Sequence, residues 1–344
     1  MGKFSDRYQG VLPLLLLLLV ITTLFSIKYG AIQIAFDEIY SSLQKSISTR
    51  DDLTLTERIF MDIRLPRAVA CVVVGASLAM SGVLMQALFR NPIVEPGLVG
   101  TSSGAAFGAS LYFVLGATFK INGGVWTLPI AACLGGTLAT TLVFFLARNK
   151  TSGKSTVVSL LLTGLAVNAL FLSGVGFMSY IARDPQARSI TFWNLGTMSG
   201  ANWQSVTIIT LSSVICLLWA LRYTKHLNAL MIGEEEALFL GVNIKRLQFV
   251  IIAINVILVA VATAFVGVIS FVGLVVPHLL RLTKGSDNRF LLLGSALLGG
   301  ILLSLADLAA RLLLAPAELP IGIVTSVVGV PVFIYLLRKN HYYF

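Results

Sequence analysis

Apolar stretches long enough to cross a lipid bilayer recur along the whole of this 344-residue chain. A helix needs roughly 20 residues to cross the hydrocarbon core of a membrane. Long alternating β patterns are missing, so helices rather than a barrel are expected to satisfy the backbone. Stretch length, flanking charge and helix breakers predict ten spans: 10–28, 66–88, 97–118, 125–147, 156–181, 204–222, 247–265, 270–283, 290–313 and 320–338.

The composition places the chain among integral membrane proteins. Hydrophobic residues make up 57% and charged residues 12%, whereas soluble domains carry about 25% charged residues. The first stretch, 10–28, lacks a signal-peptide cleavage site and is predicted to be a retained span. We expect an all-α bundle forming one transmembrane domain over 1–344, because no polar connection is long enough for a separate domain.

The positive charges indicate topology. The net charge is +10, but the cations are scattered among short loops, which argues against a nucleic-acid partner. Ten spans put both termini on one side, and placing them in the cytoplasm puts most of the 25 lysines and arginines inside. Arg64, Arg67 and Arg311 are outward exceptions that need a reason.

Two connections stand out from the short loops. Segment 29–63 is mixed in polarity, and we expect it to form an outer connection with one or two short interfacial helices. Segment 223–246 is predicted to be the longest cytoplasmic loop. Small residues at four-residue intervals predict close helix packing; they are Gly75 with Ala79, Gly100 with Gly104 and Gly108, and Gly196 with Gly200.

Two short motifs and the histidines could suggest an enzyme, but their positions in the sequence argue against catalysis. The string TSGKST, 151–156, lacks the glycine that a P-loop requires five residues before Gly153, and it follows a predicted span rather than a strand. The string GTSSG, 100–104, opens a span rather than a strand-to-helix turn. The three histidines show no catalytic or metal-ligand spacing with carboxylates. We therefore expect no covalent chemistry, no bound metal and no cofactor.

Few charges lie within the predicted spans. Asp307 and Arg311 are four residues apart, on one helical face, where an ion pair lowers the cost of keeping either near lipid. An ion-driven secondary transporter would need a buried carboxylate relay and broken inverted repeats. Asp307 alone is a weak relay, which disfavours that class.

Seven blocks, in order, resemble the FecCD-type permease subunits of bacterial ABC importers for iron-siderophores, haem and cobalamin. The resemblance implies ten spans, cytoplasmic termini, a second permease copy or paralogue, two separate ATPase subunits and an extracytoplasmic binding protein. The blocks are RLPR (64–67), SGVLMQALFRNPIVEPGLVGTSSGAAFGA (81–109), DPQARSITFWNLGTMSGANW (184–203), GEEEALFLGV (233–242), FVGLVVPHLLRL (271–282), LADLAAR (305–311) and PAELPIGIVTSVVGVPVFIYLLRK (316–339).

The resemblance suggests a role for the outward arginines. In the family, arginines at the positions of Arg64, Arg67 and Arg311 receive carboxylates from the docked binding protein. The guanidinium fork suits bidentate carboxylate binding and stays charged. The alternatives are arginines that only snorkel at span ends and, for Arg311, a simple partner for Asp307.

Two cytoplasmic elements follow from the same resemblance. Asn91 and Ile93, in a turn bounded by two prolines, match a cytoplasmic gate, and Ser155 and Thr156 match a second constriction; simple tight turns are the alternative.

The segment 234–241 resembles the coupling helix that seats in the ATPase, the alternative being a plain charged loop. Its acidic start favours a helix N-terminus and Gly241 its end; the predicted coupling residues are Glu234, Glu235, Glu236, Leu240 and Gly241.

These expectations describe the permease of an ATP-driven importer in a bacterial cytoplasmic membrane. The resemblance implies that spans 156–181 and 320–338 line the path. The resemblance favours ferric siderophore as the cargo, because it is the commonest use in the family. Haem and cobalamin are the alternatives, because ligand choice in the family rests mostly with the binding protein. An ion-driven transporter is the less favoured reading.

Overall fold

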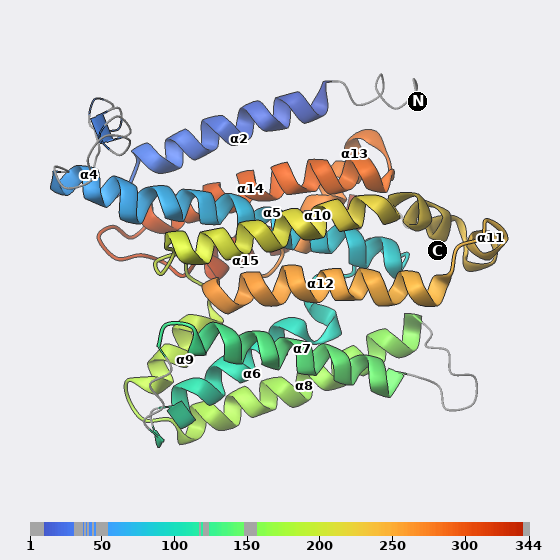
Figure 1. Cartoon of the computed structure of the whole chain (residues 1–344), viewed down its shortest axis with the longest axis horizontal. Helices are drawn as coiled ribbons and strands as arrows, with labels where there is room; N and C mark the ends of the chain where they lie inside the picture. The colour runs from blue at the N-terminus through green and yellow to red at the C-terminus, as the bar shows by residue number, and fades with distance from the viewer. Residues whose placement is uncertain are drawn as a thin grey trace.

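The computed structural model describes residues 10–30, 37, 39, 41–42, 45, 54–116, 118–119, 124–147 and 157–339, which form helices and turns without a strand. Figure 1 shows long helices running side by side along one direction. In chain order the elements are α2 (Val11–Lys28), α4 (Leu55–Ile59), η2 (Phe60–Arg64), α5 (Leu65–Leu88), η3 (Pro96–Val99), α6 (Thr101–Leu111), η4 (Tyr112–Gly116), α7 (Thr127–Ala147), α8 (Val157–Ile181), α9 (Gln186–Asn194), α10 (Trp203–Ile232), α11 (Glu234–Phe239), α12 (Ile244–Val266), α13 (Val272–Lys284), α14 (Asn288–Leu312) and α15 (Ile321–Lys339).

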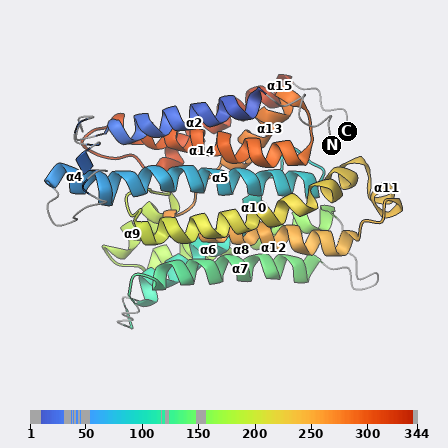
Figure 2. The ribbon, with the colours of Figure 1, turned by 45° about the horizontal axis from the view of Figure 1, so that its top comes forward.

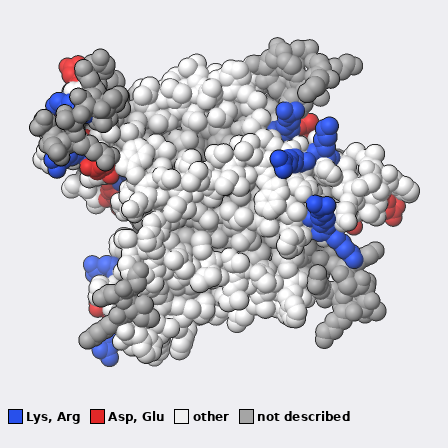
Figure 3. Space-filling model, viewed as in Figure 1, with Lys and Arg blue, Asp and Glu red and all other residues white. Residues whose placement is uncertain are grey.

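The bundle has two ends, and charged side chains mark both of them on one face (Figure 3). We call the end that carries α11 the inner end and the end that carries α4 and α9 the outer end. Helix α2 begins and α15 ends at the inner end (Figure 2). On the face shown in Figure 3, charged side chains gather at these two ends and the band between them carries none. This distribution is that of a bundle lying across a bilayer, with charged groups in the two interfaces.

Seven described helices are long and apolar enough to cross a membrane. They correspond to seven of the predicted spans. The other three predicted spans contain α6, extended by the π-helical turn η4, and the shorter apolar helices of α13 and α15. The all-helical transmembrane fold is confirmed, whereas the count of ten spans stays a prediction.

Helix α5 lies at the centre and packs against α2, α10, α12, α13 and α14. The approach to α14 is close, because a side chain added at Gly75 would overlap the backbone carbonyl of Gly299. Gly104 of α6 similarly meets the backbone of Gly135 in α7. The predicted packing role of Gly75 and Gly104 is thus confirmed; small residues let the backbones approach where lipid supplies no hydrophobic force between helices.

The predicted outer connection 29–63 is wrong at its end, because a continuous helical stretch begins at Leu55. Thr54 and Glu57 form a reciprocal capping box that fixes this start. Pro66 has no N–H to donate, and the chain accommodates it just after the π-helical turn η2. The rest of the predicted interfacial segment lies largely outside the described residues.

Two further boundaries need correction. Helix α10 continues to Ile232, so the predicted loop 223–246 is helical over its first ten residues and the true connection is α11 with its flanks. Gly196 and Gly200 do not share a helix face; they lie in the turn after α9, and Gly196 packs against the Val268 carbonyl instead. Basic residues 222 and 225 end the apolar stretch but not the helix.

Candidate functional site

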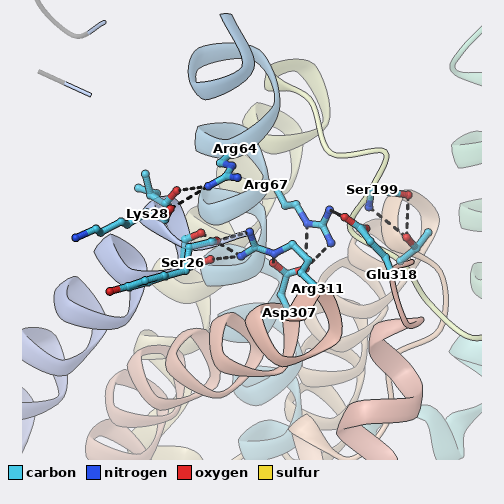
Figure 4. A network of polar contacts seen from close by, with 11 residues as sticks. Ser26, Lys28, Arg64, Arg67, Ser199, Asp307, Arg311 and Glu318 are labelled. Carbon is cyan, nitrogen blue, oxygen red and sulfur yellow. Dashed lines mark hydrogen bonds and ion pairs between the residues drawn. The ribbon is translucent and has the colours of Figure 1, made fainter. Parts of the chain in front are cut away.

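The three predicted docking arginines lie together at the outer end (Figure 4). Arg64 stands where η2 meets α5, and its side chain turns toward the end of α2. Its Nη1 donates hydrogen bonds to the carbonyl oxygens of Ile27, at 3.0 Å, and Lys28, at 3.1 Å. The residue is only 8% exposed. Arg64 therefore satisfies carbonyls that the C-terminus of α2 leaves without helical partners.

Arg311 reaches the same helix end from the last turn of α14. Its Nη2 donates to the carbonyl and hydroxyl oxygens of Ser26, at 3.0 and 2.9 Å, and its Nη1 donates to the Tyr29 carbonyl at 3.0 Å. It is 7% exposed. Two cations thus meet the negative end of the α2 dipole, which is favourable.

Asp307 connects the other two arginines. Its carboxylate is fully buried and forms ion pairs with Arg311, at 2.9 Å, and with Arg67, also at 2.9 Å. Arg67 also donates to Glu318 at 2.9 and 3.0 Å, and the Glu318 side chain is 42% exposed. The i,i+4 pair Asp307–Arg311 predicted from the sequence is confirmed. The resulting network ties α2, α5, α14 and the turn before α15.

The geometry changes what these arginines can do. The sequence predicts outward guanidinium groups, yet Arg64 and Arg311 are buried and donate to carbonyls inside the molecule. Arg67 keeps 12% of its side chain exposed and already holds two carboxylates. Sequence reasoning missed Glu318, although it stands in a block that carried the resemblance. No sequence pattern indicates that the backbone carbonyls at the end of α2 accept hydrogen bonds from Arg64 and Arg311.

At the inner end, Asn91 closes the turn after α5. Its Oδ1 accepts a hydrogen bond from the Ile93 backbone N–H at 3.0 Å, a local pattern typical of Asx turns. Both residues are partly buried. The other two predicted gate residues, Ser155 and Thr156, lie outside the described residues, so the structure does not place the two predicted constrictions relative to each other.

Glu95 links this inner connection to α13. Its Oε1 accepts a hydrogen bond from the Phe271 N–H at 3.1 Å, at the start of α13. Burial raises the pKa of the Glu95 carboxyl, and the Phe271 N–H opposes the rise. Nearby, Gln86 donates to the carbonyls of Gly273 and Leu274 and accepts from Arg281. The turn is therefore held by polar contacts to one neighbouring helix.

The predicted short helix exists as α11, Glu234–Phe239. Glu234, Glu235 and Glu236 form its first turn. At the other end Gly241 has φ +78°, and the N–H groups of Gly241 and Val242 bond back to the carbonyls of Leu238 and Ala237. This is a Schellman ending, in which glycine adopts the left-handed conformation at no steric cost.

Helix α11 buries one side and exposes a cluster of apolar side chains. Ala237 and Val242 pack into the core cluster at the inner end. Leu238, Phe239 and Leu240 are 59%, 90% and 67% exposed. Leu240 was predicted as a contact residue; Leu238 and Phe239 were missed, although the string ALFL carries the signal. Consecutive exposed apolar residues of this size mark an interaction site.

Among the described residues, an exposed ion pair joins the turn and α11, Arg90 Nη2 to Glu234 Oε1 at 3.4 Å. Among the described residues, no group of three or more His, Cys, Asp and Glu side chains could hold a metal ion.

Comparison with known proteins matches residues 18–339 to the FecCD transport family. The chain is 41% identical over 342 residues to the hemin transport system permease protein HmuU of Yersinia pestis, with 98% of each chain covered. It is 37% identical over 323 residues to the vitamin B12 import system permease protein BtuC of Vibrio parahaemolyticus, with 94% of each covered. A solved metal-chelate type ABC transporter in an inward-facing conformation has a TM-score of 0.84 and 32% identity, covering 97% of this chain and 100% of that one.

Proposed function

The chain belongs to the FecCD transport family, and from that premise we propose that it is the permease subunit of an ATP-driven importer in a bacterial cytoplasmic membrane, with both termini cytoplasmic. It forms the path and hydrolyses no ATP itself. Separate ATPase subunits, two per complex, drive the cycle, and an extracytoplasmic binding protein delivers the cargo.

The observation that carries this proposal is the exposed apolar cluster of α11. Leu238, Phe239 and Leu240 project from the inner end, on a helix whose other side is fixed in the core. Such a helix can bind an apolar groove on a partner without losing much conformational entropy, because packing within the permease already orders it. We propose that the ATPase binds here and that force passes from α11 to the turn at Asn91.

A second permease copy or a close paralogue completes the path. Helix α8 exposes Leu162, Leu165, Leu170 and Phe177, and α15 exposes Val327. The resemblance assigns these two helices to the path. We propose the pairing with a second permease from the same resemblance.

The outer network supports a modified docking proposal. We propose that Arg64, Arg67 and Arg311 form the positive region that the binding protein meets, with Arg67 as the contact residue. Its accessible partner, Glu318, is 42% exposed and could exchange with a carboxylate of the binding protein. Arg64 and Arg311 act through their field and by holding α2, because their donors face internal carbonyls. An exposed contact of this kind steers encounter more than it adds affinity.

We propose an iron chelate as the cargo. Ferric siderophore is the candidate predicted from the sequence. Haem is the second candidate, because a hemin permease is similar over nearly the full length of both chains. Cobalamin remains an alternative on the same basis. Titrating the cognate binding protein with each chelate identifies the cargo, since that protein selects it.

Uptake by proteoliposomes tests the proposal. The complex should accumulate cargo with ATP and stop when the ATPase is inactivated by substitution of its catalytic residues. Phe239→Ser should lower co-purification of the ATPase, while Phe192→Ser, the same change at an exposed position on α9 at the outer end, should preserve it. Uptake that persists on an ion gradient without a working ATPase would reject the proposal in favour of a secondary transporter.

A further inference from the structure

A groove of about 1320 Å³ opens between α7 and α12 at the inner end. The two helices touch toward the outer end, where the rings of Trp126 and Phe265 are 6.0 Å apart and the Cys133 thiol contacts the Ala260 carbonyl at 3.5 Å. Toward the inner end the helices separate. The groove thus ends inside the bundle at these contacts and extends to the inner end, where Asn243 and Lys245 line it.

The groove has the depth of one membrane leaflet. Its wall on α12 extends from Ile244 to Ile257, about 20 Å at 1.5 Å per residue. Half of the hydrocarbon core is about 15 Å, and the headgroup region lies beyond it. A transport path would have to continue through the second leaflet, where contacts between α7 and α12 close this groove.

The walls change in polarity along that depth. The deeper part is lined by Ile252, Val256 and Ile257. Threonines also line it, but their hydroxyls are engaged elsewhere: Thr137 and Thr141 donate to carbonyls of their own helix, and the Thr140 hydroxyl bonds to that of Thr101. The groove therefore offers mainly apolar contacts below its rim, as an acyl chain requires.

Polar and charged groups gather at the rim. Asn243, Lys245 and Gln248 stand there with Arg90, whose charge is shared with Glu234. Within the described part of the chain, no acidic side chain pairs with the exposed Lys245 ammonium. Lys245, Phe249, Ile252 and Val256 follow one face of α12, so the charge stands directly above the apolar wall. Figure 3 shows lysine and arginine side chains spread along the inner end of this face, including the region where Figure 1 places the start of α12.

We propose that this groove binds an anionic phospholipid of the inner leaflet. Its phosphate lies at Lys245, and its acyl chains lie against Phe249, Ile252 and Val256. Juxtamembrane cations attract anionic lipids in this way. A segment of the ATPase is the rival occupant, because α11 supplies Glu234 and Leu238 to the rim. It fits less well, because most of the groove lies at hydrocarbon depth, where a soluble partner does not reach.

Binding of phosphatidylglycerol to the purified full-length chain, measured by native mass spectrometry, tests the proposal. Lys245→Gln should weaken binding about fivefold, the contribution of one juxtamembrane cation. Arg246→Gln is the matched control: it is the next residue, equally basic and exposed, but it does not line the groove, and its effect should stay below about twofold. Ala253→Trp should weaken binding by filling the groove, and a monodisperse elution peak checks its folding.

Three outcomes would overturn the proposal. Equal losses from Lys245→Gln and Arg246→Gln would show only a diffuse attraction to the basic end. Equal retention of phosphatidylcholine, or displacement by soluble glycerol phosphate, would remove the anionic lipid as the occupant. Release of the lipid when the ATPase subunits bind would assign the groove to them. The inference needs only the membrane orientation, so it can fail while ATP-driven transport stands.

Discussion

Replacing Asp307 with asparagine tests whether the outer arginines are chiefly structural. The change keeps the shape and one acceptor but removes the charge between Arg67 and Arg311, whose side chains are 12% and 8% exposed. Breaking a buried ion pair by removing one partner costs about 3–5 kcal/mol, because a charge is left buried without compensation. Arg67 keeps Glu318 and Arg311 keeps the α2 carbonyls, so we expect the low end, about 3 kcal/mol.

Glu318→Gln is the matched control, since it neutralises the other carboxylate held by Arg67. Glu318 is 42% exposed, and exposed ion pairs contribute about 0–1 kcal/mol. The free energy of unfolding of both variants, from SDS titration in mixed micelles, should therefore differ by at least about 2 kcal/mol. Losses of equal size would refute the reasoning, and a loss below about 1 kcal/mol for Asp307→Asn would show that the arginines are not held by this carboxylate.

Three further predictions follow from particular contacts. Gly75→Ala should destabilise the fold by about 1–3 kcal/mol, because its methyl overlaps the Gly299 carbonyl, whereas Gly176→Ala, a helical position with open space around it, should change unfolding little or stabilise it. Glu95→Ala should cost about 1 kcal/mol by leaving the Phe271 N–H without its acceptor. Glu95→Gln keeps an acceptor for the Phe271 N–H but removes the buried charge. Because burial raises the Glu95 pKa, the ionised carboxylate destabilises the native chain near pH 7. The gain in thermal stability of the Gln variant over the native chain should therefore be greatest near pH 7 and should fade as the pH falls through that raised pKa.

The helices were predictable where hydropathy alone sets them. Seven predicted spans correspond to helices that are long and apolar enough to cross a membrane, because an apolar run bounded by charges has one low-energy place in a membrane. The predicted helix boundaries were wrong where a helix continues beyond the apolar run. Thr54 and Glu57 carried a readable capping signal for the early start. The extension of α10 to Ile232 had no such sequence signal, because basic residues end a hydrophobic stretch without ending a helix.

The site was predictable only in its local parts. The Asp307–Arg311 pair follows from four-residue spacing, and the ending of α11 at Gly241 follows from its glycine. Arg67 and Asp307 are 240 positions apart, and no periodicity relates them; only the family resemblance grouped these arginines. The burial of Arg64 and Arg311 depends on where α2 ends in space, which a single sequence does not encode in any local pattern.

The contacts at the two ends differ in strength, and this difference bears on where motion occurs. At the outer end, two buried arginines and a buried carboxylate join α2, α5 and α14, and separating them leaves charges unpaired in a dry environment. At the inner end, α11 is joined to the turn after α5 by one exposed pair, Arg90–Glu234, of a type that contributes about 0–1 kcal/mol. A force applied at α11 meets the weaker contacts first. We therefore expect the inner connections to move while the outer network keeps its geometry, so that the surface at the outer end changes less than the turn after α5.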